Sequence, residues 1–169
     1  MNEYGCLMVD PSKRQTVQLI EYGKSIVSDS IIYNDSTNEF GRELEPHITV
    51  LYGFVNDLTP EQVKALVGGI KNIDATITGV DKFSNPMYDV AIFTIQSHIL
   101  EELNKKSKTT YKVVNSYPIY HPHLTIAYVK KGMFNFKKTN LNIPLKIETI
   151  TYSGKDNTGN PKIKFTLPI

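Results

Sequence analysis

The chain has 169 residues, of which 40% are hydrophobic and 21% are charged, and its formal net charge is +2. This composition is ordinary for a soluble globular domain and excludes an intrinsically disordered chain. No apolar run is long enough to cross a bilayer, and the first residues lack the pattern of a secretory signal peptide. We therefore expect one domain over residues 1–169 and no membrane partner.

Short strands and helices alternate along the chain. Residues 4–9 predict a first strand, and Asp10 and Pro11 then supply an N-cap and a first-turn proline for a helix that runs to about Val27. The segment Asp29–Pro46 is polar and rich in turn-forming residues. It predicts a long exposed loop, and long loops often carry function.

The second half of the pattern favours strands. Thr59 and Gln62, with Pro60 between them, resemble a capping box at the start of a helix, and Ser97 caps a further short helix. Strand composition marks four segments, which are residues 75–83, 88–95, 145–153 and 161–169. The last two flank a turn-rich stretch and predict a hairpin. Segregated helices and mostly hairpin-connected strands indicate an α+β fold.

Charge and cysteine content add two expectations. Residues 130–164 contain eight lysines and two acidic residues, whereas the rest of the chain is acidic overall. Such a basic segment would attract a polyanion such as a nucleotide, although it would equally suit a lysine-rich surface that protects edge strands. The single cysteine, Cys6, fits a small buried residue in the first strand, and one cysteine without a partner predicts a reducing, cytoplasmic setting.

The phrase His-apolar-Thr-apolar-X-Tyr occurs twice in the chain. The first copy contains His47 and Thr49, and the second contains His123 and Thr125, 76 residues further on. Because side chains alternate faces along a strand, each His shares a face with its Thr while the apolar residues face a core. One alternative is that these residues only fill a half-buried strand face. The occurrence of two matched His-Thr pairs favours an active site over this alternative.

Two imidazoles that face one cleft can divide acid and base work at neutral pH. One accepts a proton from an attacking hydroxyl group, and the other protonates the departing oxygen. Each threonine hydroxyl can donate a hydrogen bond to a non-bridging phosphate oxygen and stabilise the charge that develops in the transition state. This chemistry predicts phosphoryl transfer without a metal.

Paired His-x-Thr motifs half a chain apart resemble the signature of the 2H phosphoesterase superfamily. That superfamily includes RNA 2′,3′-cyclic phosphodiesterases, 2′-5′ RNA ligase-like proteins and phage enzymes that degrade cyclic nucleotides. The contexts "EPHITVLYGF" and "HPHLTIAYV" are most similar to the phage anti-CBASS nucleases, which destroy cyclic di- and trinucleotide signals of bacterial immunity. The resemblance implies a bilobal α+β fold with two pseudo-symmetric antiparallel sheet lobes, flanking helices and a central cleft.

The resemblance also implies roles and a substrate. His47, Thr49, His123 and Thr125 would be catalytic, and neither histidine is assigned as the base. A ribose 2′-hydroxyl would attack its own 3′-phosphodiester and open a cyclic di- or trinucleotide such as cGAMP through a 2′,3′-cyclic phosphate. No cofactor and no obligate protein partner is expected, and a phage-encoded enzyme would act in the host cytoplasm. The alternatives are an RNA-end 2′,3′-cyclic or 2′-5′ phosphodiesterase and a non-catalytic protein that sequesters such ligands.

Other side chains are candidates for contacts with substrate or metal. Aromatic rings stack on bases and lysines contact phosphates; the candidate substrate-binding residues are Tyr4, Phe83, Tyr120 and Lys155. Tyr52 and Tyr128 end the two phrases at an odd spacing, so in regular strands they would face away from the site. His121, together with the two motif histidines, could form a zinc site. Pro122 disturbs the strand there, so we rank this metal site below metal-free chemistry, and we expect His98 to lie on the surface.

Overall fold

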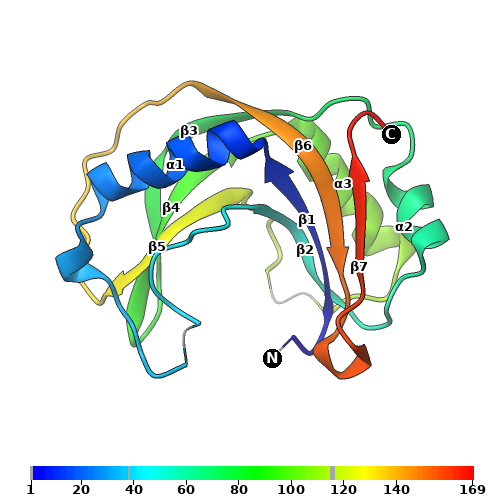
Figure 1. Ribbon diagram of the computed structural model, residues 1–169, viewed down its shortest axis with the longest axis horizontal. Coiled ribbons are helices and arrows are strands. Elements are labelled where there is room, and N and C mark those ends of the chain that lie inside the picture. Colours follow the sequence, from blue (N-terminus) through cyan, green and yellow to red (C-terminus); the bar gives the residue numbers. More distant parts are fainter. Residues whose placement is uncertain (1, 38, 115–116) are drawn as a thin grey trace.

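The computed structural model describes residues 2–37, 39–114 and 117–169, which form an arch of two lobes (Figure 1). The described strands are β1 (Gly5–Pro11), β2 (Ile48–Phe54), β3 (Asp74–Ser84), β4 (Tyr88–Gln96), β5 (His123–Lys130), β6 (Ile143–Ser153) and β7 (Lys162–Thr166). The described helices are α1 (Lys13–Ile26), α2 (Pro60–Val67) and α3 (His98–Thr110), with two short 3-10 turns at Asp29–Ile31 and Asp156–Thr158.

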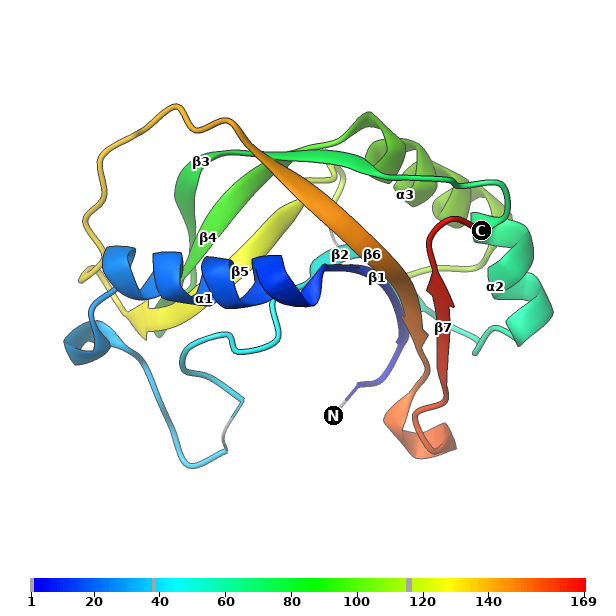
Figure 2. The same cartoon turned by 45° about the horizontal axis from the view of Figure 1, so that its top comes forward.

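The strands of the described residues form one antiparallel sheet in the order β1-β2-β5-β4-β3-β6-β7, and β6 also pairs with β1. Lobe 1 comprises β1, β2, β6 and β7 with α2 and α3, and lobe 2 comprises β3, β4 and β5 with α1 (Figure 2). The predicted α+β fold with two antiparallel lobes is therefore confirmed. The two lobes are halves of one hydrogen-bonded sheet, joined where β2 meets β5 in the middle of the arch and again where β3 meets β6.

The helices cover one face of this sheet and create the core. On lobe 2, the Tyr22 ring of α1 stacks on Phe93 at 5.4 Å between centroids. Gly23 of α1 lies so close to the Ile126 side chain that a Cβ there would come within 2.9 Å of it. On lobe 1, α3 packs behind β2. The opposite face of the sheet carries no helix in the described residues, and we call it the open face.

The start of α1 differs from the prediction. Asp10 and Pro11 are the last residues of β1, and Ser12 is the N-cap, whose hydroxyl accepts a hydrogen bond from the Gln15 N–H. Pairing of β1 with β6 continues as far as Pro11, so strand pairing overrides the capping signal of the Asp-Pro pair. The predicted capping box of Thr59 and the Ser97 cap are both present.

The segment Asp29–Pro46 is more ordered than the predicted exposed loop. Its described part forms single antiparallel bridges to β5, at Ile32 with Val129 and at Arg42 with Ala127. These bridges hold the segment against the edge of lobe 2, since β5 has backbone groups there that β2 leaves unpaired. Asn38, inside the predicted loop, lies outside the described residues.

Candidate active site

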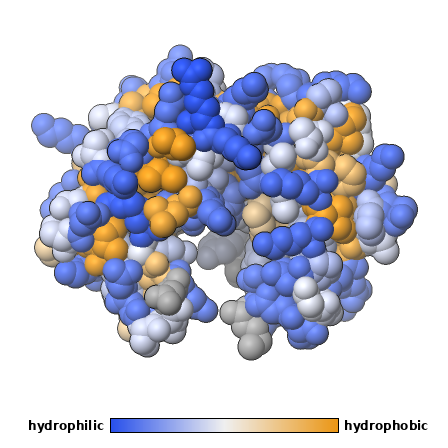
Figure 3. Space-filling model, viewed as in Figure 1, coloured by the Kyte–Doolittle hydropathy of each residue, from blue (hydrophilic) through white to orange (hydrophobic). Residues whose placement is uncertain are grey.

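The pairing of β2 with β5 determines the geometry of the two motifs. Ile48 of β2 pairs with Leu124 of β5, and both side chains are fully buried in the core. The residues on either side of each therefore point to the open face, and all four are partly exposed: His47, Thr49, His123 and Thr125. In this antiparallel register each histidine lies opposite the threonine of the other motif. Figure 3 shows the molecule hollowed between the two lobes.

Both motif histidines are held in the same tautomer by matching hydrogen bonds. His47 Nδ1 lies 3.0 Å from the carbonyl oxygen of Glu45, and His123 Nδ1 lies 2.8 Å from that of His121. Because a carbonyl oxygen can only accept, each Nδ1 carries the hydrogen. In the neutral rings Nε2 is then the free base, so both imidazoles present the same atom for proton transfer.

The two imidazoles differ in their surroundings. Burial lowers the pKa of His123, and the nearby His47 and His121 lower it further, although the hydrogen bond to the His121 carbonyl acts in the opposite direction. The ring of Phe83 packs edge-to-face against His123, with centroids 4.8 Å apart. His123 is therefore neutral at physiological pH in the free protein, which suits a general base.

The zinc alternative is not supported by the positions of the described residues. Among them, no group of three His, Cys, Asp or Glu side chains is placed to hold a metal ion. His121 is exposed and contributes its backbone carbonyl to His123 instead of a ring nitrogen to a shared site. His98 is exposed as the first residue of α3, as expected.

A β-bulge follows the threonine of the first motif. The register between β1 and β2 skips Val50, so that Val50 and Leu51 both face the core. Tyr52 then points to the same face as Thr49 and is 43% exposed. The unpaired Val50 carbonyl is satisfied from α3, where the buried Asn104 side chain donates to it at 2.7 Å.

The second motif contains the same bulge. The register between β4 and β5 skips Ile126, and Ile126 and Ala127 are both buried. Tyr128 again lies on the face of Thr125, partly exposed. Here the bulged carbonyl, that of Ile126, accepts from the backbone N–H of Glu43 at 3.0 Å. Each bulge thus has its own donor outside the sheet ladder.

These bulges overturn one prediction. Tyr52 and Tyr128 were expected to face away from the site because they follow their histidines at an odd spacing. That expectation assumes a regular strand, and a bulge inserts one extra residue that shifts all later side chains to the other face. Both tyrosines therefore lie on the open face with the histidines and threonines.

The four predicted substrate-binding residues lie in different settings. Phe83 is beside His123 and 39% exposed, and Tyr4 makes an edge contact with Tyr52 at 5.9 Å. Tyr120 is partly buried, and its hydroxyl donates to the Thr49 carbonyl at 2.9 Å. The ammonium group of Lys155 donates to the carbonyl of Val55 at 3.1 Å. Phe83 and Tyr4 therefore have rings at the open face, whereas the polar groups of the other two contact the protein itself.

Tyr120 links the two motifs through a hydrogen bond. It precedes the strand of the second motif and anchors the backbone of the first, and burial raises the pKa of its hydroxyl so that it remains a donor. We expect Tyr120→Phe to lower kcat roughly tenfold with little change in KM, because Thr49 loses its anchor. Steady-state kinetics on the substrate found for the wild type would measure this. A kcat equal to that of the wild type would contradict the anchoring role.

Sequence reasoning missed several polar residues on the open face of lobe 1. The Asp10 carboxylate accepts from the hydroxyls of Thr149 and Thr151, at 2.7 and 2.9 Å. Cys6 lies in β1 as predicted, mostly buried beside Thr49, and its thiol donates to the carbonyl of Leu7 at 3.9 Å. Burial raises the pKa of this thiol to about 12, so it stays protonated. The Asp10 contacts depend on the β1–β6 register and the position of Cys6 beside Thr49 on the β1–β2 register, neither of which a local pattern of the sequence specifies.

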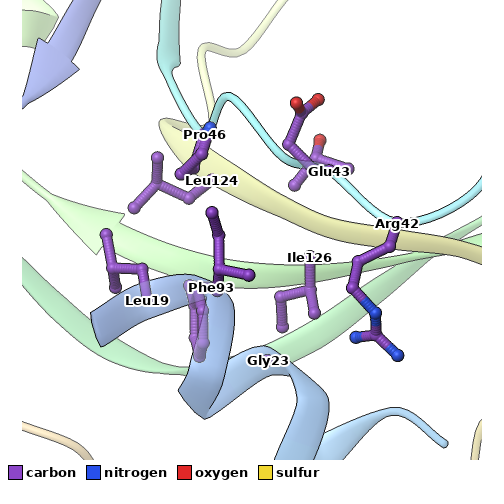
Figure 4. Close-up of a pocket in the computed structure, with 10 residues that line it drawn as sticks. Leu19, Gly23, Arg42, Glu43, Pro46, Phe93, Leu124 and Ile126 are labelled. Atoms are coloured by element: carbon purple, nitrogen blue, oxygen red, sulfur yellow. The ribbon is translucent and has the colours of Figure 1, made fainter. Parts of the chain in front are cut away.

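Two cavities lie beside α1, and Thr125 of the second motif contributes to the lining of the smaller one. One, of about 10 Å³, lies between α1, β5 and the segment before β2 (Figure 4). It holds at most about one water molecule, and within the described residues the buried Nη1 of Arg42, which lines it, has no hydrogen-bond partner. The other, of about 220 Å³, lies between Tyr22 of α1, Val80 of β3 and Phe136. Neither contains the motif histidines.

Comparisons with known proteins bear on the family and on the fold. A family model described as the 2′-5′ RNA ligase superfamily matches residues 34–135, which include both motifs. No curated protein matches the chain. In the described residues no helix is long and apolar enough to cross a membrane.

Solved structures share the fold along the whole chain. E. coli LigT complexed with NADP+ is similar with a TM-score of 0.63 and 12% identity, covering 99% of each chain. TT0787 of Thermus thermophilus has a TM-score of 0.56 and 12% identity, covering 97% of this chain and 94% of its own. Kluyveromyces marxianus Usb1 has a TM-score of 0.57 and 9% identity, covering 98% and 99%. At these identities the likeness is one of fold.

Proposed function

The chain belongs to the 2′-5′ RNA ligase superfamily and is a phosphodiesterase of the 2H type, and we propose that it opens cyclic di- and trinucleotides without a metal. The supporting observation is the meeting of two His-x-Thr motifs at one residue pair, with both Nε2 atoms available. Such cyclic nucleotides are signals of bacterial immunity, so the activity would let a phage evade CBASS defence.

The proposed reaction uses the difference between the two imidazoles. Neutral His123 accepts the proton of a ribose 2′-hydroxyl at Nε2, and the 2′-oxygen attacks the adjacent phosphorus. Protonated His47 donates its Nε2 proton to the departing 5′-oxygen, and the P–O5′ bond breaks. The hydroxyls of Thr49 and Thr125 donate to the non-bridging oxygens as negative charge grows on them. The product is a linear nucleotide that ends in a 2′,3′-cyclic phosphate.

One observation favours the RNA-end alternative. The strand registers place Lys164 of β7 in one cross-strand row with Thr151, Met8 and Thr49. Residues in such a row share a face, so the exposed ammonium of Lys164 extends the open face of lobe 1 with positive charge. A positive charge at this distance from the motifs suits the phosphate of a longer RNA strand better than a compact ring.

The test is hydrolysis of a substrate panel in excess EDTA. The panel contains 3′,3′-cyclic GMP–AMP, cyclic tri-adenylate and an RNA ending in a 2′,3′-cyclic phosphate. The double variant His47→Ala/His123→Ala serves as the inactive control. We expect the wild type to open the cyclic oligonucleotides and the variant to leave them intact.

The other outcomes identify the alternatives. Cleavage of the RNA end alone would move the protein to the RNA-end class. Loss of activity in EDTA, restored by a divalent cation, would refute the metal-free chemistry. Tight binding of the rings without turnover would leave a protein that sequesters them.

A further inference from the structure

Two aromatic rings among the described residues of the open face are more than a third exposed, one in each lobe. Tyr52 of β2 is 43% exposed and Phe83 of β3 is 39% exposed. The bulge in β2 directs Tyr52 to this face. Phe83 reaches it because it shares a cross-strand row with Val90 and Tyr128. Tyr52 therefore lies beyond Thr49 on the open face of lobe 1, and Phe83 lies against His123 in lobe 2.

Phe83 is directly beside the reacting groups. Its ring and that of His123 are 4.8 Å apart between centroids, with planes at 85°. A flat group that stacks on the exposed side of Phe83 would lie next to the imidazole proposed to deprotonate the ribose. A nucleobase attached to that ribose is such a group.

Tyr52 is the exposed aromatic ring on the open face of lobe 1. Because Val50 is the extra residue of the bulge, Tyr52 lies two residue pairs beyond Thr49 in the β1–β2 ladder, a rise of about 7 Å. The Tyr52 ring and the Thr49 hydroxyl can therefore contact different parts of one small ligand. Tyr4 supports the ring by an edge contact at 5.9 Å and 79°. This support fixes the ring while leaving much of it exposed, which lowers the entropic cost of stacking on it.

The two lobes are not equivalent in this respect. Tyr128, the counterpart of Tyr52, contacts Phe40 at 5.2 Å and Tyr88 at 5.5 Å, and these rings pack the segment Asp29–Pro46 onto lobe 2. The ring of Tyr128 is thus engaged within the protein. In lobe 2 the uncovered ring beside the site is that of Phe83.

We propose that Tyr52 and Phe83 are stacking surfaces for two nucleobases, one on each side of the scissile phosphate. This inference rests on the proposed function and names the substrate class. The preferred substrates are internucleotide diesters that carry a base on both sides, which include cyclic dinucleotides. Terminal 2′,3′-cyclic phosphates and alkyl esters, which carry a base on one side, are the poorer substrates.

The test separates binding from turnover. Binding is measured by calorimetry with the 2′-deoxy form of cyclic di-adenylate, which lacks the attacking hydroxyl and cannot be opened. Turnover is measured with cyclic di-adenylate and with adenosine 3′-(methyl phosphate), which has one base. The variants are Tyr52→Leu, Phe83→Leu and Tyr52→Phe. Tyr111→Leu is the matched control, because Tyr111 contacts Phe54 and Gln62 away from the open face.

Each leucine variant is expected to weaken binding of the deoxy ring by roughly 5-fold to 150-fold, the effect of losing one stacked base. Tyr52→Phe and Tyr111→Leu should bind like the wild type. With the one-base ester, only one of the two leucine variants should lower kcat/KM. Thermal unfolding of every variant checks that the fold is intact.

Three results would count against the proposals, and they are distinguishable. Wild-type affinity and turnover in both leucine variants would overturn the stacking surfaces and leave the proposed function standing. Stacking-dependent binding of the deoxy ring without opening of cyclic di-adenylate would overturn the proposed function and sustain the stacking surfaces. Absence of any binding by the wild type would overturn both.

Discussion

Replacing either His47 or His123 by alanine is expected to lower kcat by about 10²–10⁴-fold while the fold remains intact. Each ring is partly exposed on the open face, and its removal costs the core little. Each provides one of the two proton transfers, so the loss from either variant is large and the double variant adds little to it. His98→Ala, at the exposed start of α3, is the matched control and should retain full activity.

The pH dependence of kcat/KM tests the assignment of His123 as the base. The base acts in its neutral form, and the pKa of His123 is lowered by burial and by its two neighbouring imidazoles. The acidic limb of kcat/KM, which reports the free enzyme, should therefore lie below the usual histidine value of about 6.5. Activity should decline only as pH falls through that lowered pKa. An acidic limb at or above pH 6.5 would assign the base to another group.

Asp89→Ala is expected to destabilise the folded chain by about 3 kcal/mol at pH 7. The carboxylate is 1% exposed, accepts from the Gly132 N–H at 3.0 Å and from Lys131 at 2.9 Å, and lies 3.5 Å from the Lys82 ammonium. It joins the start of β4 to the turn that follows β5. Alanine would leave these donors unpaired, and the melting temperature should fall by roughly 5–12 °C.

The contribution of Asp89 to the free energy of unfolding should also decrease as the pH is lowered. Burial alone would raise its pKa, but hydrogen bonds from Gly132, Lys131 and Ser84 lower it from 3.8 to about 2. A carboxylate whose pKa is lower in the folded chain stabilises the fold at pH values above its pKa in the unfolded chain. This stabilisation is lost as the pH falls through its pKa in the folded chain. The gap in unfolding free energy between wild type and variant should therefore narrow between about pH 4 and pH 2. Urea titrations at several pH values measure it.

A matched variant controls for the loss of one surface charge. Asp74→Ala removes an exposed carboxylate whose partner is the nearby Asn72 amide. It should change the unfolding free energy by no more than about 0.5 kcal/mol at any pH. Equal effects of the two substitutions would show that Asp89 acts through net charge and not through its buried hydrogen bonds.

Much of the fold and the four motif residues could be predicted from the sequence, because their signals are local. The capping box at Thr59, the hairpin of β6 and β7 and the shared face of each His and Thr follow from short-range chemistry. The start of α1 could not be predicted, because pairing of Pro11 with β6 depends on a strand far along the chain. The same holds for the bond from Tyr120 to Thr49, which crosses between the motifs.

The aromatic residues of the open face show the same division. Phe83 could be proposed from the sequence because it is an aromatic residue beside a predicted turn, and the structure places its ring against that of His123. The prediction for Tyr52 was wrong because alternation cannot reveal where a strand gains a residue. The donors that make the two bulges possible, Asn104 and the backbone of Glu43, lie on elements distant in sequence.

The two bulges can be recognised from the spacing of threonine and tyrosine in the sequence. A tyrosine that shares a face with a threonine should follow it by two residues in a regular strand, yet in both phrases it follows by three. A spacing of three is therefore the mark of this bent strand, present in "TVLY" and again in "TIAY". A relative whose aromatic follows its threonine by two is expected to build the same surface from a straight strand, with no need of a donor such as Asn104.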